Sequence, residues 1–114
     1  MERIVEQTLL YDFYGELLNE HQRQIYTEAV FNDYSLSEIA DEYGISRQGV
    51  HDLIKRVDKT LTEYEEKLHL IEKFIATKEK VHLIDRYANG YISSSDIDCI
   101  HKIQDIAKEI IEDF

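Results

Sequence analysis

Residues 36–55, LSEIADEYGISRQGVHDLIK, carry the clearest structural pattern in this chain. It predicts two short helices joined by a tight turn at Gly44, with Ser46 opening the second helix, and this is the pattern of a helix-turn-helix. Gly44 supplies the left-handed residue that a sharp turn requires, and Ile45 is expected to plug the turn. The positions that must pack inward are filled by Ile39, Ala40, Tyr43, Val50 and Leu53. An ordinary αα-hairpin with a glycine in its turn is the alternative interpretation.

The rest of the chain is also predicted to be helical, because it contains no Pro and only four Gly. A first helix is expected over about residues 2–18, with a buried face formed by Val5, Leu9, Phe13 and Leu17. A second helix begins at Asn19, which forms an N-x-x-Q capping box with Gln22. A third begins at Ser35, in an S-x-x-E capping box with Glu38. The predicted fold class is therefore all-α.

Downstream, apolar residues recur at alternating spacings of four and three, at Val50, Ile54, Val57, Leu61, Tyr64, Leu68, Ile71 and Ile75. This heptad seam predicts one helix of about 30 residues that lays the seam on another helix. The seam either packs within the chain or pairs with a second copy. We favour a homodimer, because eight positions exceed what short neighbouring helices can cover. Beyond it we expect a helix over about residues 77–87, a break at Gly90, and a last helix from a Ser93–Ser95 cap to the end.

Charge is distributed unevenly along the chain. The chain carries 13 Lys and Arg against 24 Asp and Glu, a net charge of -11. Such a protein is a poor partner for a polyanion unless its cations are gathered in one place. Residues 35–61 hold four cations against five acids, and all four cations lie between Ser46 and Lys59. The second helix of the motif is thus the locally basic helix of an acidic chain.

The polar residues of this basic helix point outward when its apolar residues are turned inward. In the major groove of DNA, Arg pairs with guanine and Gln with adenine, while Ser and Lys suit phosphates. Asp52 could accept from cytosine or simply repel the DNA. A solvated helix face is the alternative interpretation. The predicted DNA-binding residues are Ser46, Arg47, Gln48, His51, Asp52, Lys55, Arg56 and Lys59.

Several segments resemble region 4 of bacterial sigma factors, the domain that reads promoter DNA. They are Leu17-Leu18, Gln22-Arg23, Leu36–Ala40, Gly44–Arg47, Val50 and Ile54–Arg56. Together with Ser46–Gln48 and Tyr64–Leu70, they are similar to the YlxM family of small sigma-region-4-like helix-turn-helix proteins. The resemblance covers about residues 1–75. It implies a sigma region-4-like bundle, of the winged-helix-like class without a wing, and a DNA-binding regulatory role linked to the signal recognition particle pathway.

The length of 114 residues predicts one compact unit. We divide it into a helix-turn-helix DNA-binding domain over residues 1–61 and a helical, acidic dimerisation extension over residues 62–114. No run of about 18 apolar residues is present, and the start lacks the cations of a signal peptide. A single Cys99 allows no internal disulfide, in agreement with a reducing compartment. We therefore expect a cytoplasmic protein without membrane insertion.

No catalytic motif stands out, so the chain is expected to be neither an enzyme nor a cofactor protein. Three acid-x-x-His pairs have di-iron spacing but flank the apolar stripes, so no metal site is predicted: Glu66/His69, Glu79/His82 and Asp98/His101. Cys99 is interpreted as a core residue. The alternative to DNA binding is an acidic module that docks on signal recognition particle components without DNA, through surface acids such as Glu63, Glu65, Glu66 and Asp113.

Overall fold

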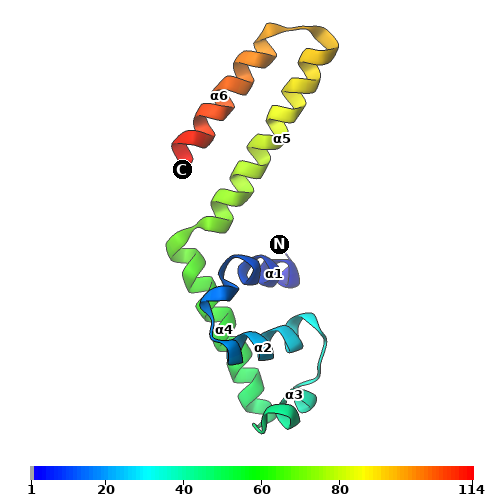
Figure 1. Cartoon of the computed structure of the whole chain (residues 1–114), viewed down its shortest axis with the longest axis vertical. Coiled ribbons are helices and arrows are strands. Elements are labelled where there is room, and N and C mark those ends of the chain that lie inside the picture. Colours follow the sequence, from blue (N-terminus) through cyan, green and yellow to red (C-terminus); the bar gives the residue numbers. More distant parts are fainter. Residues whose placement is uncertain (1) are drawn as a thin grey trace. The chain divides into compact units, whose positions relative to one another are not determined.

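A computed structural model describes residues 2–114, and among these residues it contains helices and no strand (Figure 1). The elements are α1 (Arg3–Tyr14), a 3-10 turn (Gly15–Leu17), α2 (Glu20–Tyr26), a π-helical turn (Thr27–Phe31), α3 (Leu36–Tyr43), α4 (Arg47–Leu68), α5 (Leu70–Ser94) and α6 (Ile97–Asp113). The all-α prediction is confirmed. The chain forms two compact units, Met1–His69 and Leu70–Phe114. The expected boundary after residue 61 falls inside α4, eight residues before this division.

The first unit is built around α4, which packs against α1, α2 and α3. Its inner face is closed by side chains with no exposed surface, Val50, Val57 and Leu61. Each such side chain contributes about 1.5–3 kcal/mol of burial free energy. The opposing residues from the other helices are Leu10, Tyr14, Leu18, Ile25, Tyr26, Ile39 and Ala40. This internal core holds α4 at a defined rotation about its axis, with its opposite face turned outward.

Two predicted helix starts, the capping boxes at Asn19 and Ser35, are confirmed. The Gln22 backbone N–H donates to Asn19 Oδ1 at 2.8 Å, and the Asn19 N–H donates to Gln22 Oε1 at 3.0 Å. The same reciprocal pair joins Ser35 and Glu38, at 3.1 and 3.3 Å. Gly44 has φ of 67°, the left-handed conformation predicted for the turn. These local signals could be read from the sequence because each depends on neighbours within a few residues.

The predicted buried face of α1 is wrong. Val5 and Leu17 are 45% and 58% exposed, whereas Leu10 and Tyr14 are buried. The buried face is turned by about one residue, 100° on a helix, relative to the prediction. Tyr14 explains the rotation, because its ring packs inward while its hydroxyl donates to Glu65 Oε1 at 2.5 Å. A buried tyrosine with a partner outcompetes an apolar residue for the core position.

The predicted 30-residue helix and its continuous seam are also wrong. α4 ends at Leu68, and His69 has φ of 55°, so the chain turns before α5 begins at Leu70. The His69 N–H donates to the Glu65 carbonyl at 2.9 Å and closes the helix end. Histidine is one of the few non-glycine residues enriched in the left-handed region. No Gly or Pro marks this break, which is why the heptad pattern concealed it.

The second unit is an antiparallel pair formed by α5 and α6. α5 runs through Gly90 without a break, so the predicted interruption is wrong. The turn lies later, at Ser95, with φ of 59°, and the cap of α6 is Asp96, whose side chain accepts from the Asp98 N–H at 3.0 Å. A Cβ at Gly90 would lie 3.4 Å from Cys99 Sγ. The glycine thus allows close approach of α6 rather than ending α5.

Candidate nucleic-acid interface

The start of α4 is the centre of the candidate interface. Ser46 caps the helix, because its Oγ accepts from the Gly49 N–H at 2.9 Å. Val50 and Leu53 are buried beneath the first turns, as predicted. Ile45, which was expected to plug the turn, is 37% exposed and does not close it. The N-terminal turns of α4 are therefore fixed from behind and open in front.

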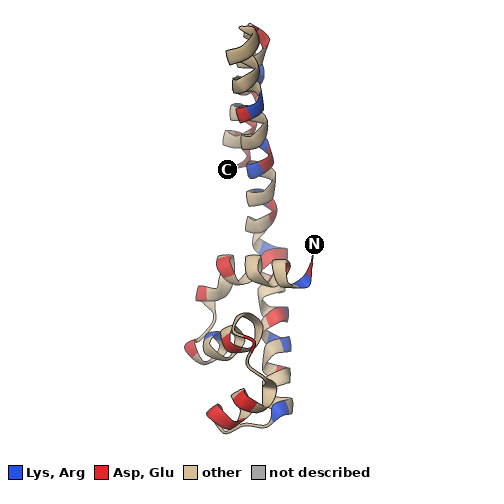
Figure 2. Cartoon of the chain, turned by 90° about the vertical axis from the view of Figure 1, so that its right-hand side faces the viewer, with Lys and Arg blue, Asp and Glu red and all other residues tan. Residues whose placement is uncertain are grey.

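Four cations line the exposed length of α4: Arg47, Lys55, Arg56 and Lys59. Within residues 2–114, none of them lies within ion-pairing distance of a carboxylate. Figure 2 shows the cations and acids along this helix. Cations without an internal counter-ion are free to contact phosphates and to release the counter-ions bound there. The acidic chain therefore retains a row of available positive charge.

Between these cations, three polar side chains contact one another. Gln48 Nε2 donates to Asp52 Oδ1 at 2.9 Å, and His51 Nδ1 lies 3.7 Å from the same oxygen. The bond to Asp52 uses one N–H of the Gln48 amide and leaves its carbonyl oxygen and its second N–H unused. A glutamine needs one donor and one acceptor to read adenine. The hydrogen bond to Asp52 therefore orients Gln48 and leaves it one donor and one acceptor for such a contact.

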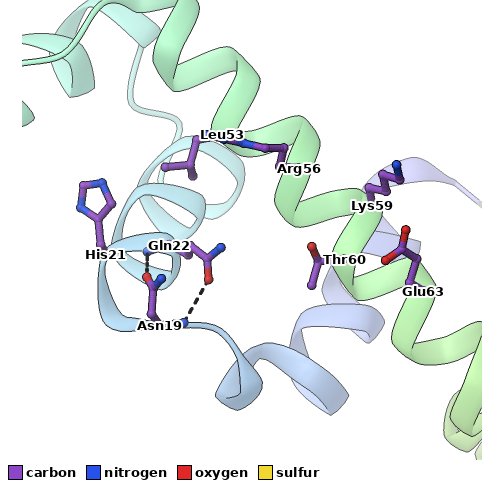
Figure 3. Close-up of a pocket in the computed structure, with 8 residues that line it drawn as sticks. All are labelled: Asn19, His21, Gln22, Leu53, Arg56, Lys59, Thr60 and Glu63. Carbon is purple, nitrogen blue, oxygen red and sulfur yellow. Dashed lines mark hydrogen bonds between the residues drawn. The ribbon is translucent and has the colours of Figure 1, made fainter.

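The eight predicted residues do not all line one hollow. A hollow of about 510 Å³ is lined by Leu36, Ser46, Arg47, Gln48 and His51. A second hollow of about 540 Å³ lies between α2 and α4 (Figure 3) and is lined by Asn19, His21, Gln22, Leu53, Arg56, Lys59, Thr60 and Glu63. Asp52 and Lys55 line neither.

This division follows from the rise of the helix. Arg56 and Lys59 are nine and twelve residues beyond Arg47, about 14 and 18 Å along the axis. The major groove is only about 12 Å wide, so α4 can place its first turns against bases while these two cations lie near the groove's edge. Leu36 and His21 also line the two hollows, and the sequence prediction omitted them. Leu36 lies within the helix-turn-helix motif, but the sequence pattern does not indicate that a leucine at the start of a helix is exposed.

Asp58, one of the acids counted with these cations, lies on the other side of α4. Asp58 accepts from the Tyr26 hydroxyl at 2.5 Å and from Gln7 Nε2 at 3.2 Å, and Arg3 lies 3.5 Å away. Burial, followed by the hydrogen bond to Asp58, raises the pKa of Tyr26 well above its usual range. The carboxylate of Asp58 is therefore engaged by residues of α1 and α2 and points away from the exposed cations of α4.

The described residues hold no group of three or more His, Cys, Asp or Glu side chains able to bind a metal ion. None of the helices formed by residues 2–114 is long and apolar enough to cross a membrane.

A left-handed glycine between two capped helices, with the second helix open to solvent along a basic face, defines a helix-turn-helix protein. The model of the UPF0122 family, described as YlxM/p13-like helix-turn-helix proteins, matches residues 1–106. The chain belongs to this family, as the motif resemblance implied.

Curated relatives agree along most of the chain. A UPF0122 protein of Desulforamulus reducens is 40% identical over 104 residues, covering 91% of this chain and 89% of the relative. The UPF0122 protein YlxM of Bacillus subtilis is 41% identical over 90 residues, covering 79% and 82%. A UPF0122 protein of Caldanaerobacter subterraneus is 51% identical over 77 residues, covering 68% and 66%.

Proposed function

We propose that this protein binds duplex DNA in a sequence-dependent manner and acts as a regulatory protein in the cytoplasm. The first turns of α4 enter the major groove, in the way that sigma region 4-like motifs do. The observation that carries the proposal is a set of four exposed cations, Arg47, Lys55, Arg56 and Lys59, which have no carboxylate within ion-pairing distance among residues 2–114 and lie on a helix whose inner face is buried.

The residues divide into two roles. Arg47 and Gln48, in the first turn, reach base edges, and Arg47 is suited to guanine. Lys55, Arg56 and Lys59 contact phosphates and set the register of the helix on the duplex. Asp52 holds Gln48, with His51 Nδ1 3.7 Å from the same Asp52 oxygen, and Ser46 caps the helix as an acceptor, which leaves its O–H able to donate to a phosphate.

A polarisation titration with a randomised duplex at low salt tests the proposal. Wild-type protein binds, and Lys55→Ala lowers the slope of log affinity against log salt by about 1, because one phosphate contact is lost. Arg47→Ala weakens binding to the preferred sequence by about tenfold or more. Lys67→Ala is the matched control, since Lys67 is an exposed cation in the last turn of α4, about 30 Å from Arg47. Absence of duplex binding by the wild type would overturn the proposal.

A second candidate is docking of the acidic surface on a component of the signal recognition particle. The exposed acids Glu63 and Glu66 lie on the same unit as the motif and favour a basic partner. Glu65, also expected to serve, is already bonded to Tyr14, and Asp113 pairs with Lys80 at 2.7 Å. Reversing Glu63 and Glu66 to Lys should abolish a salt-sensitive pull-down of particle components. Retention of the same partners by the reversed variant would exclude this surface.

A further inference from the structure

Polar contacts tie together the two helices of the α5–α6 hairpin (Figure 1), and we call the line of these contacts its polar edge. Lys80 Nζ lies 2.7 Å from Asp113 Oδ2 and 3.8 Å from Glu109 Oε2. Lys102 Nζ lies 5.2 Å from the centre of the Tyr87 ring. These contacts, with the close approach of Gly90 and Cys99, define which side of each helix faces its neighbour.

Each helix also carries an apolar stripe, which lies beside these contact positions around the helix circumference. On α5 it recurs at helical spacing as Thr77, Val81, Ile84, Ala88 and Ile92. On α6 it is formed by Ile100, Ile103, Ala107, Ile110, Ile111 and Phe114. Neither stripe contains a charged residue. On each helix, viewed from its own N-terminus, the apolar stripe is reached from the contact positions by turning about the helix axis in the same direction. Because the helices run antiparallel, the same sense of rotation leads to the same side of the hairpin.

The two stripes therefore form one apolar face across the hairpin, and this face is open. Ile92, Ile111 and Phe114 are 79%, 74% and 75% exposed, and Val81 is 51% exposed. Among the described residues of this unit, only Ile71 and Ile106 fall in the buried class. A pair of helices has no third layer on which to close such a face. Large contiguous apolar patches of this kind mark interaction surfaces.

We infer that a second copy of this chain covers this face, so that two α5–α6 hairpins form an antiparallel four-helix bundle. The face is about 26 Å long, the length of α6, and about 20 Å wide, the width of two helices. Its projection of roughly 500 Å² underestimates the accessible surface of ridged helices and is compatible with the ~800 Å² per partner of a specific interface. Apart from Thr77 and the Lys73 ammonium, which lies 5.8 Å from the centre of the Phe114 ring, this face is apolar and therefore complementary to itself, as a two-fold interface requires.

The width and charge of the hairpin distinguish this occupant from others. One foreign amphipathic helix would fill a single groove and leave half of a two-helix face exposed. An anionic membrane would be repelled, because residues 70–114 carry nine Asp and Glu against six Lys and Arg. A second hairpin matches both the width and the lack of charge at the centre of the face. This inference goes beyond DNA binding and does not depend on it.

Sedimentation equilibrium of the full chain, without DNA, tests the inference. We expect a mass of about 27 kDa, twice that of the 13.5 kDa chain. The double variant Ile92→Glu, Ile111→Glu should halve this mass with an unchanged circular dichroism spectrum, because both side chains are already largely exposed in one copy. Leu17→Glu is the control, since Leu17 is 58% exposed outside the hairpin and its substitution should leave the mass at twice that of the chain.

Two outcomes would overturn the inference. One is a wild-type chain that stays at 13.5 kDa at micromolar concentration. Co-sedimentation of such a monomeric chain with phosphatidylglycerol vesicles belongs to the same outcome, because a membrane and not a second copy would then cover the face. The other is a dimer that persists in the double variant, which would place the interface elsewhere. Duplex binding measured on the same double variant separates this inference from the proposed function, because each α4 motif remains folded in a single copy.

Discussion

The two units of this chain are both made of helices, but they obtain their stability differently. Eleven of the described residues in the first unit are buried apolar or aromatic side chains, against two in the second. The first unit closes its core internally because short helices surround α4 on its inner face. The second has two long helices and no covering layer. Amphipathic helices alone therefore do not close a core; a further layer of helices must cover their apolar faces.

The largest effect is expected from breaking the internal core of the first unit. Leu61 has no exposed surface on α4. Leu61→Ala should lower the free energy of unfolding of this unit by about 2–5 kcal/mol, through lost burial and a cavity. Urea denaturation followed by circular dichroism measures the loss. The control Leu17→Ala, at a position 58% exposed, should change stability by less than about 0.5 kcal/mol. Similar effects of the two substitutions would contradict this account of the core.

Dilution should distinguish the second unit from the first. If two hairpins form one bundle, lowering the protein concentration about a hundredfold reduces the stability of the bundle by about 2.7 kcal/mol. The first unit carries its own core and should keep its unfolding midpoint. Hydrogen exchange read by mass spectrometry resolves the two units in one sample. Equal protection of α5 and α6 at both concentrations would count against the shared bundle.

The proposed DNA interface on α4 includes a local polar contact between Gln48 and Asp52, and substitution of Asp52 tests it. Asp52→Ala removes the acceptor that holds the Gln48 amide at 2.9 Å. Discrimination between adenine and other bases should fall by about 1–3 kcal/mol, while total affinity for duplex DNA should not fall, because one repelling charge is lost. Asp41→Ala, on the exposed surface of α3, removes the same charge and should preserve discrimination. Competition binding with base-substituted duplexes measures both quantities.

Alkaline pH should affect the first unit through Tyr43. Burial, followed by the hydrogen bond that its hydroxyl donates to Glu28, raises the pKa of Tyr43 from 10.0 to about 12. A tyrosine with a raised pKa in the folded state stabilises the fold fully below pH 10 and loses that contribution as pH rises towards 12. Tyr43→Phe should therefore flatten the loss of stability over this range. Tyr34→Phe, at a position 45% exposed, should leave the profile steep. Urea midpoints at several pH values report the difference.

The contrast between the units also explains what could be predicted from the sequence. Capping boxes at Asn19 and Ser35 and the left-handed Gly44 were predicted correctly, because their causes lie within a few residues. The helix-turn-helix followed from them, since its turn and caps are local. The eight interface residues stay a prediction, although the structure separates those at the start of α4 from Arg56 and Lys59.

The errors share a different origin. The face of α1 was mispredicted because the Tyr14 hydroxyl finds Glu65 from another helix, a contact that periodicity does not report. The seam was extended through His69 because histidine gives little warning of a left-handed turn. Gly90 was interpreted as a break because its packing against Cys99 depends on a helix that follows later in the chain. In each case the deciding partner is distant in sequence or absent from the local pattern.

The smallest effect is expected at the polar edge of the hairpin. The hydrogen bond to Asp113 is the main cause that raises the pKa of Lys80, so the pairing stabilises the folded state fully below the usual lysine pKa and is lost as pH rises through the raised pKa of the folded state. The partner carboxylates are 44% and 59% exposed, so solvent screens this ion pair and Lys80→Met should leave the free energy of unfolding nearly unchanged at neutral pH. It should leave the proposed dimer intact, because the second copy would cover the apolar face and not this polar edge. Denaturation and sedimentation of the same variant check both statements; loss of the dimer in Lys80→Met would assign the interface to the polar edge instead.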